Sequence, residues 1–164
     1  MTTATFTPKL HWRKAGAVSE GAEGTGGNGW WQTGPYDADL AVAFRRAQDA
    51  EPAKDDHGFT GRTIAEPWES EDWVEYVLTG GTRTVLDQVH TVAADFTERG
   101  PYMRPLTPDE VRAWCPDDRP TRERWEAALA ADHELCPDRA QGNCTVLHEG
   151  GEPSEIGYWG VTAD

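Results

Sequence analysis

The chain is short of the aliphatic side chains from which most protein cores are built. Leu, Ile, Val and Phe supply only 24 of its 164 residues, and the formal net charge is -14. That combination approaches the composition of disordered chains. Eight Trp and four Tyr offset the shortage, because each of these side chains can bury about 150 to 250 Å². The composition therefore predicts a single domain over residues 1–164 with an aromatic-rich core.

Two segments have the pattern of β-hairpins. Apolar residues alternate over 73–79, and Gly80-Gly81 offers a two-residue turn into 82–86. In the second, within 143–161, two segments with a strand pattern flank a turn at Gly150-Gly151. We therefore expect a small antiparallel sheet built from hairpins at about 73–86 and 143–161.

Three segments have helical patterns. The clearest begins at Thr107, where Pro108 and Glu110 complete a capping box. Asp37 is expected to cap another. The helices are expected at about 38–49, 108–115 and 121–135. Together with the hairpins they predict an α+β fold with the helices packed on one side of the sheet. A Gly-rich stretch at about 16–29 has no apolar periodicity and is expected to be a loop.

The negative charge is concentrated beyond residue 50. The first fifty residues carry five acids and five bases, whereas the remainder carries 24 acids and 10 bases. Its densest part, between Ile64 and Thr82, contains no Lys or Arg and has two tryptophans among its acids. The partner-binding residues predicted there are Glu66, Trp68, Glu69, Glu71, Asp72, Trp73 and Glu75.

An acidic surface with large aromatic side chains favours a basic partner. The leading hypothesis is an acidic interaction protein, such as an inhibitor, an antitoxin, an immunity-type protein or a nucleic-acid mimic. Two alternatives stay open. The acids can form a merely solvating face, or the chain can be a small enzyme or small-molecule-binding protein with a pocket lined by Trp and Tyr. Direct binding of nucleic acid is disfavoured, because Lys and Arg are not clustered.

Zinc-ligand residue types occur at His133, Cys136, Cys144 and His148. If 144–148 is a strand, however, Cys144 and His148 lie about 13 Å apart, which is too far for two ligands of one zinc ion. No metal or other cofactor is therefore expected. The cysteine count is odd and no signal peptide or membrane span is recognisable, so reduced thiols and a cytoplasmic location are expected.

Overall fold

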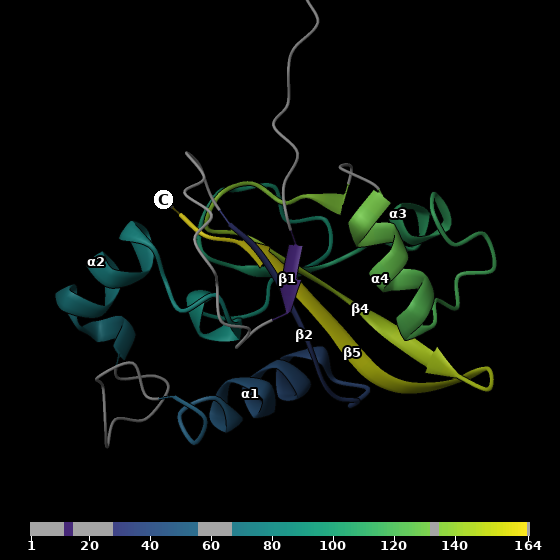
Figure 1. The fold of residues 1–164 in the computed structure, drawn as a ribbon, viewed down its shortest axis with the longest axis horizontal. Helices are drawn as coiled ribbons and strands as arrows, with labels where there is room; N and C mark the ends of the chain where they lie inside the picture. The colour runs from purple at the N-terminus through teal and green to yellow at the C-terminus, as the bar shows by residue number, and fades with distance from the viewer. Residues whose placement is uncertain (1–11, 15–27, 56–66, 132–134, 164) are drawn as a thin grey trace, which may run out of the picture.

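The computed structural model describes residues 12–14, 28–55, 67–131 and 135–163. Its centre is a sheet whose strands lie in the order β1-β2-β5-β4-β3 (Figure 1). These strands are β1 (Trp12–Lys14), β2 (Gly29–Pro35), β3 (Met103–Pro105), β4 (Gly142–Glu149) and β5 (Glu152–Val161). The α+β class is confirmed. The sheet is mixed rather than antiparallel, because β1 pairs with β2 and β3 pairs with β4 in parallel.

The predicted hairpin at 143–161 is confirmed. Strands β4 and β5 pair in antiparallel fashion along most of their length. The turn residues Gly150 and Gly151 have φ values of 61° and 82°, which residues other than glycine rarely adopt. The Gly-rich loop predicted at 16–29 lies outside the described residues, apart from its last two positions.

The predicted hairpin at 73–86 is wrong. Residues Glu71–Thr79 form helix α2, which follows the 3-10 turn η1 (Pro67–Glu69), and Val85–Asp87 form a second 3-10 turn, η2. Glu71 and Asp72 lie in the first turn of α2, where the helix dipole favours negative charge. Gly81, with φ of 69°, ends the helix; the sequence analysis had assigned this glycine to a strand-to-strand turn.

The three predicted helices are present with shifted ends. They are α1 (Leu40–Ala50), α3 (Pro108–Arg112) and α4 (Arg122–Ala131). Asp39 rather than Asp37 caps α1, with its carboxylate accepting from the backbone of Ala41 and Val42. The capping box at Thr107 is confirmed. Residues 132–134, within the expected range of the third helix, lie outside the described residues.

The helices do not all pack on one side of the sheet, as had been expected. Helix α1 packs on one face, where Phe44 and Tyr158 share a cluster with Trp30. Helix α4 packs on the other face, where Trp125 joins Trp159. Neighbouring residues of a strand point to opposite faces, so each of the central strands β2 and β5 supplies an aromatic side chain to both clusters. The sheet therefore lies between two helical layers (Figure 1).

The core is rich in aromatic side chains, as predicted. Trp30, Trp125, Trp159 and Tyr158 are each 1% exposed or less. Glycines of β5 make room for two of the indoles. A Cβ on Gly157 would lie 2.9 Å from the ring of Trp125, and a Cβ on Gly160 would lie 2.6 Å from the ring of Trp30. The large side chains on the facing elements thus require the smallest residue on the central strand.

Candidate partner-binding surface

Helix α2 lies at one end of the molecule, at the end opposite to α4 (Figure 1). One of its sides is buried: Trp73 and Val77, four residues apart, pack with Leu86 of η2 in a small cluster. Because residues at i and i+4 lie on the same side of a helix, Val74 and Leu78 form a second apolar row. Leu78 is 50% exposed, so this row is open to solvent.

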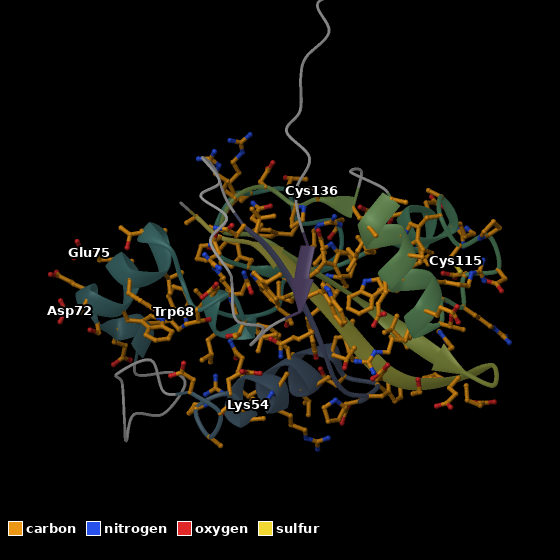
Figure 2. All side chains as sticks on the ribbon, in the orientation of Figure 1. Lys54, Trp68, Asp72, Glu75, Cys115 and Cys136 are labelled. Atoms are coloured by element: carbon orange, nitrogen blue, oxygen red, sulfur yellow. The ribbon has the colours of Figure 1, made fainter. Side chains whose placement is uncertain are left out.

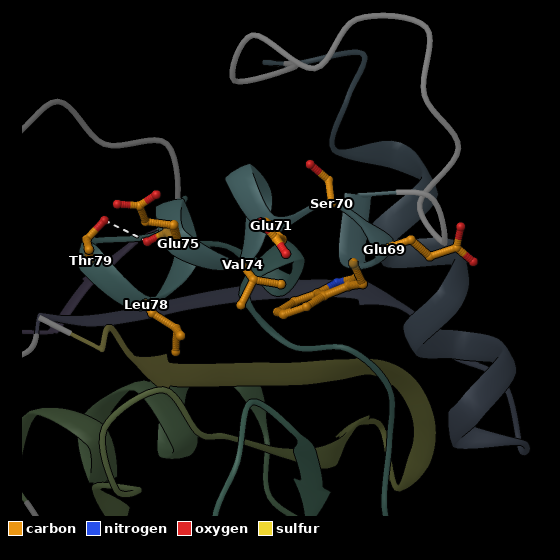
Figure 3. A pocket seen from close by; sticks show the side chains of 8 residues that line it. Glu69, Ser70, Glu71, Val74, Glu75, Leu78 and Thr79 are labelled. Atoms are coloured by element: carbon orange, nitrogen blue, oxygen red, sulfur yellow. Dashed lines mark hydrogen bonds between the residues drawn. The ribbon is translucent and has the colours of Figure 1, made fainter.

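An open groove of about 610 Å³ runs along this second row. Its apolar lining comes from Trp68, Val74 and Leu78. In Figure 3 the side chains of Val74 and Leu78 leave α2 in the same direction. The Trp68 ring lies 6.3 Å from that of Trp73, with the two planes at 80°. The buried tryptophan therefore holds the half-exposed one in place at the end of the groove.

Carboxylates border the groove. Glu69, Glu71 and Glu75 line it, and Asp72 is exposed on the same helix (Figures 2 and 3). None of these four acids forms an ion pair with another described residue. Elsewhere many acids are paired with Lys or Arg: Asp37, Asp49, Glu51, Asp109, Glu110, Asp117, Asp118, Glu126, Asp138 and Glu155. The groove thus combines an apolar lining with negative charge that the described residues do not neutralise.

The structure brings together most of the residues predicted to bind a partner. Trp68, Glu69, Glu71 and Glu75 line one groove. Three predicted residues have other positions: Glu66 lies outside the described residues, Asp72 is exposed but does not line the groove, and Trp73 is only 3% exposed and faces the protein. Trp73 therefore supports the surface from beneath.

Val74 and Leu78 line the groove but were not among the predicted partner-binding residues. The alternation of apolar residues over 73–79 favoured a strand, with Val74, Tyr76 and Leu78 on one face. The signal that identifies Val74 and Leu78 is helical spacing. They are four residues apart, as are Glu71 and Glu75, so each pair lies along one side of a helix. Interpreted as a helix, the same segment has one buried apolar row and one apolar row beside carboxylates.

Asp87 fixes the C-terminal end of α2 to η2. One of its carboxylate oxygens accepts from the backbone N–H of Thr82 at 2.6 Å and from the Thr82 hydroxyl at 2.8 Å. The other accepts from the backbone N–H of Arg83 at 2.9 Å. The side chain is 2% exposed, and a Cβ on Gly81 would lie 2.6 Å from it. The buried carboxylate of Asp87 therefore holds Thr82 and Arg83, which follow α2, in place.

Burial raises the pKa of Asp87 to about 6, although hydrogen bonds from Thr82 and Arg83 act in the opposite direction. This pKa exceeds the ordinary value of 3.8, so the folded protein binds the proton more tightly than the unfolded chain does. The contribution of Asp87 to the free energy of unfolding therefore increases as the pH falls from about 6 towards 4.

The variant Asp87→Asn removes this titration. We expect the free energy of unfolding of the unsubstituted protein, minus that of the variant, to grow by about 2 kcal/mol between pH 7 and pH 4. Urea denaturation of both proteins at each pH measures the difference, and titrations common to the two cancel. A difference that does not change with pH would contradict the assignment.

Three of the zinc-ligand residues considered from the sequence, Cys136, Cys144 and His148, are described, and they do not gather as a metal site requires. Cys144 is buried with Ile156 and Tyr158, and it lies on strand β4 (Gly142–Glu149) together with His148. Side chains four residues apart on a strand are about 13 Å apart, which is too far for two ligands of one zinc ion. His133 lies outside the described residues. Within the described part of the chain no three His, Cys, Asp or Glu side chains gather as a metal site requires.

No helix within the described ranges is both long and apolar enough to cross a membrane. Comparison of the chain with family models, with curated proteins and with solved structures found no match.

Proposed function

We propose that this protein is an acidic interaction protein whose groove on α2 binds a positively charged, amphipathic segment of a partner protein. The observation that carries the proposal is the position of Glu69, Glu71 and Glu75, which are unpaired among the described residues and border an apolar groove. Inhibitors, antitoxins and immunity-type proteins that cover the cationic cleft of a nuclease would use such a surface.

The apolar lining argues against a purely solvating face. A solvating face needs only charge, whereas Val74 and Leu78 expose aliphatic surface along the same helix that carries the acids. Burying that surface is favourable by roughly 25 cal/mol per Å². Glu71 and Glu75 lie one helical turn apart and repel each other, so an incoming cation relieves this repulsion. The burial of aliphatic surface and the relief of this repulsion both favour an occupant that is apolar on one side and basic on the other.

The expected occupant of the groove is a helical or extended segment that carries aliphatic side chains flanked by Lys or Arg. Its aliphatic groups would contact Val74 and Leu78, and its cations would pair with Glu71 and Glu75. An arginine gains further from Trp68, because a guanidinium stacks on an indole while it donates to a carboxylate.

The test is capture of partners from the native host on the immobilised protein, followed by binding measurements with the purified partner. Leu78→Ser removes an exposed aliphatic side chain from the groove and should weaken binding about tenfold. The matched control is Val42→Ser, which removes another exposed aliphatic side chain, from α1; Val42 is 39% exposed. We expect Val42→Ser to leave the affinity unchanged.

The proposal requires that the captured partner be basic and that Leu78→Ser alone reduce its affinity. Equal affinities for the two variants would place the binding surface elsewhere and overturn the assignment of the groove. Capture of acidic or neutral proteins only would overturn the choice of partner class.

A further inference from the structure

A second cavity, of about 400 Å³, lies on the face of the sheet opposite α1. It is lined by side chains of α3 and the two residues after it, of the end of β3, of the start of β4 and of the segment 135–138. Its volume falls within the range of small-molecule sites. None of its lining residues belongs to the α2 groove, so it is independent of the proposed function.

The polar residue that defines this cavity is Asn143, which is only 6% exposed. Its Nδ2 donates to the backbone carbonyl of Arg104 at 3.0 Å, which fixes the orientation of the amide. The Oδ1 atom accepts no hydrogen bond from a described residue. It is not fully buried, because the unpaired side-chain atoms that are fully buried belong to other residues. The acceptor is therefore held in place and accessible from the cavity.

The charges that line the cavity are largely compensated. Arg104 forms two hydrogen bonds with Glu110, of 2.7 and 2.9 Å, and this pairing lowers the pKa of Glu110 to about 2. The pair is therefore ionised at neutral pH, and its two charges cancel. Asp138 faces Arg99 at 3.7 Å. No uncompensated cation among the lining residues is available for an anionic ligand.

The remaining lining is apolar or neutral. Trp114, Leu106 and Leu135 provide apolar walls, and Gln141 contributes a second side-chain amide. No described residue is hydrogen-bonded to the Gln141 side chain. A primary amide on a ligand has both a donor for Asn143 Oδ1 and an acceptor for the NH₂ group of Gln141.

We propose that this cavity binds a small uncharged ring compound that carries an amide group. The amide N–H donates to Asn143 Oδ1, and the amide oxygen accepts from Gln141. The ring lies among Trp114, Leu106 and Leu135, where it replaces water at an apolar wall.

An NMR titration of the ¹⁵N-labelled protein with nicotinamide, a neutral aromatic amide, tests the proposal. Saturable shifts are expected for the Asn143 side-chain NH₂ and the Trp114 indole N–H, with a Kd of about 1 mM or lower. Nicotinate has the same ring but a carboxylate, which meets no free cation in the cavity. It should bind at least about tenfold more weakly.

The variant Ala113→Phe places a ring at the rim of the cavity, at the C-cap of α3, without removing a side-chain hydrogen bond, and it should weaken nicotinamide binding at least about tenfold. A thermal melt checks that it folds. If it does not, Gln141→Ala replaces it, with the same expectation. The proposal fails if nicotinamide causes no saturable shifts, if nicotinate binds equally well, or if the cavity variant binds nicotinamide as the unsubstituted protein does.

Discussion

Replacing Glu71 and Glu75 together by lysine should weaken binding of the basic partner by at least about 100-fold. Each substitution removes an attraction and adds a repulsion at the edge of the groove, and a loss of about 1.4 kcal/mol at each position gives this factor. Both side chains are exposed and form no ion pair with a described residue. A lysine in the first turn of α2 should cost about 1 kcal/mol or less, so the fold should remain intact. Isothermal titration with the purified partner measures the change.

The matched control is Glu149→Lys with Glu152→Lys, at the β4–β5 turn. Both residues are exposed, and they lie opposite each other in the hairpin. The pair alters the net charge by the same amount at a distance from α2 (Figure 1). Its affinity should stay within about threefold of that of the unsubstituted protein. An equal loss in both double variants would mean that net charge, rather than the groove, drives binding.

A large loss of stability is expected when the aromatic core is altered at Trp125. Trp125 is fully buried, and its ring centroid lies 5.5 Å from that of Trp31 and 5.8 Å from that of Trp159. Trp125→Ala should lower the free energy of unfolding by about 4 kcal/mol. Gly157→Ala should cost about 2 kcal/mol in the unsubstituted protein, because its Cβ meets the Trp125 ring at 2.9 Å.

The two substitutions should not be additive. Once Trp125 is replaced by alanine, the added methyl group on Gly157 has room, so its cost should vanish and the coupling should reach about 2 kcal/mol. Gly160→Ala is the control, since its Cβ would meet Trp30 on the other face of the sheet. Its cost should be the same in both backgrounds. Chemical denaturation of the variants measures all these values, and additive costs for Trp125 and Gly157 would contradict the described packing.

The elements that the sequence predicted well have strong local signals. Thr107 and Glu110 specify a helix start through their own hydrogen bonds, and the fixed backbone angle of Pro108 suits the first helical position. Gly150-Gly151 specifies a hairpin because few other residues tolerate its backbone angles. These features depend on neighbouring residues alone, and the structure confirms both.

The segment 73–79 was predicted wrongly because its apolar residues satisfy two periodicities. Val74, Tyr76 and Leu78 alternate as in a strand, while Trp73 and Val77 repeat as in a helix. Burial of Trp73 and Val77 against Leu86 decides in favour of the helix. Leu86 belongs to the second half of the predicted hairpin, and the alternation over 73–79 does not indicate that Trp73 and Val77 both pack against it.

The composition of the groove was predictable in part. The concentration of acids near two tryptophans was visible in the sequence, and most of those residues do line one groove. The cavity at Asn143 was not predictable. It depends on the pairing of β3 with β4 and on packing between α3 and 135–138, and neither leaves a trace in local sequence patterns.

Attraction between the groove and a basic partner can be measured as the rate constant for their association, by stopped flow at ionic strengths from about 20 to 300 mM. If the carboxylates beside the groove attract a basic segment, this rate constant should fall at least about tenfold over that range. In the variant with Glu71→Gln and Glu75→Gln it should fall much less. A rate constant that does not change with ionic strength would show that the carboxylates beside the groove do not attract the partner.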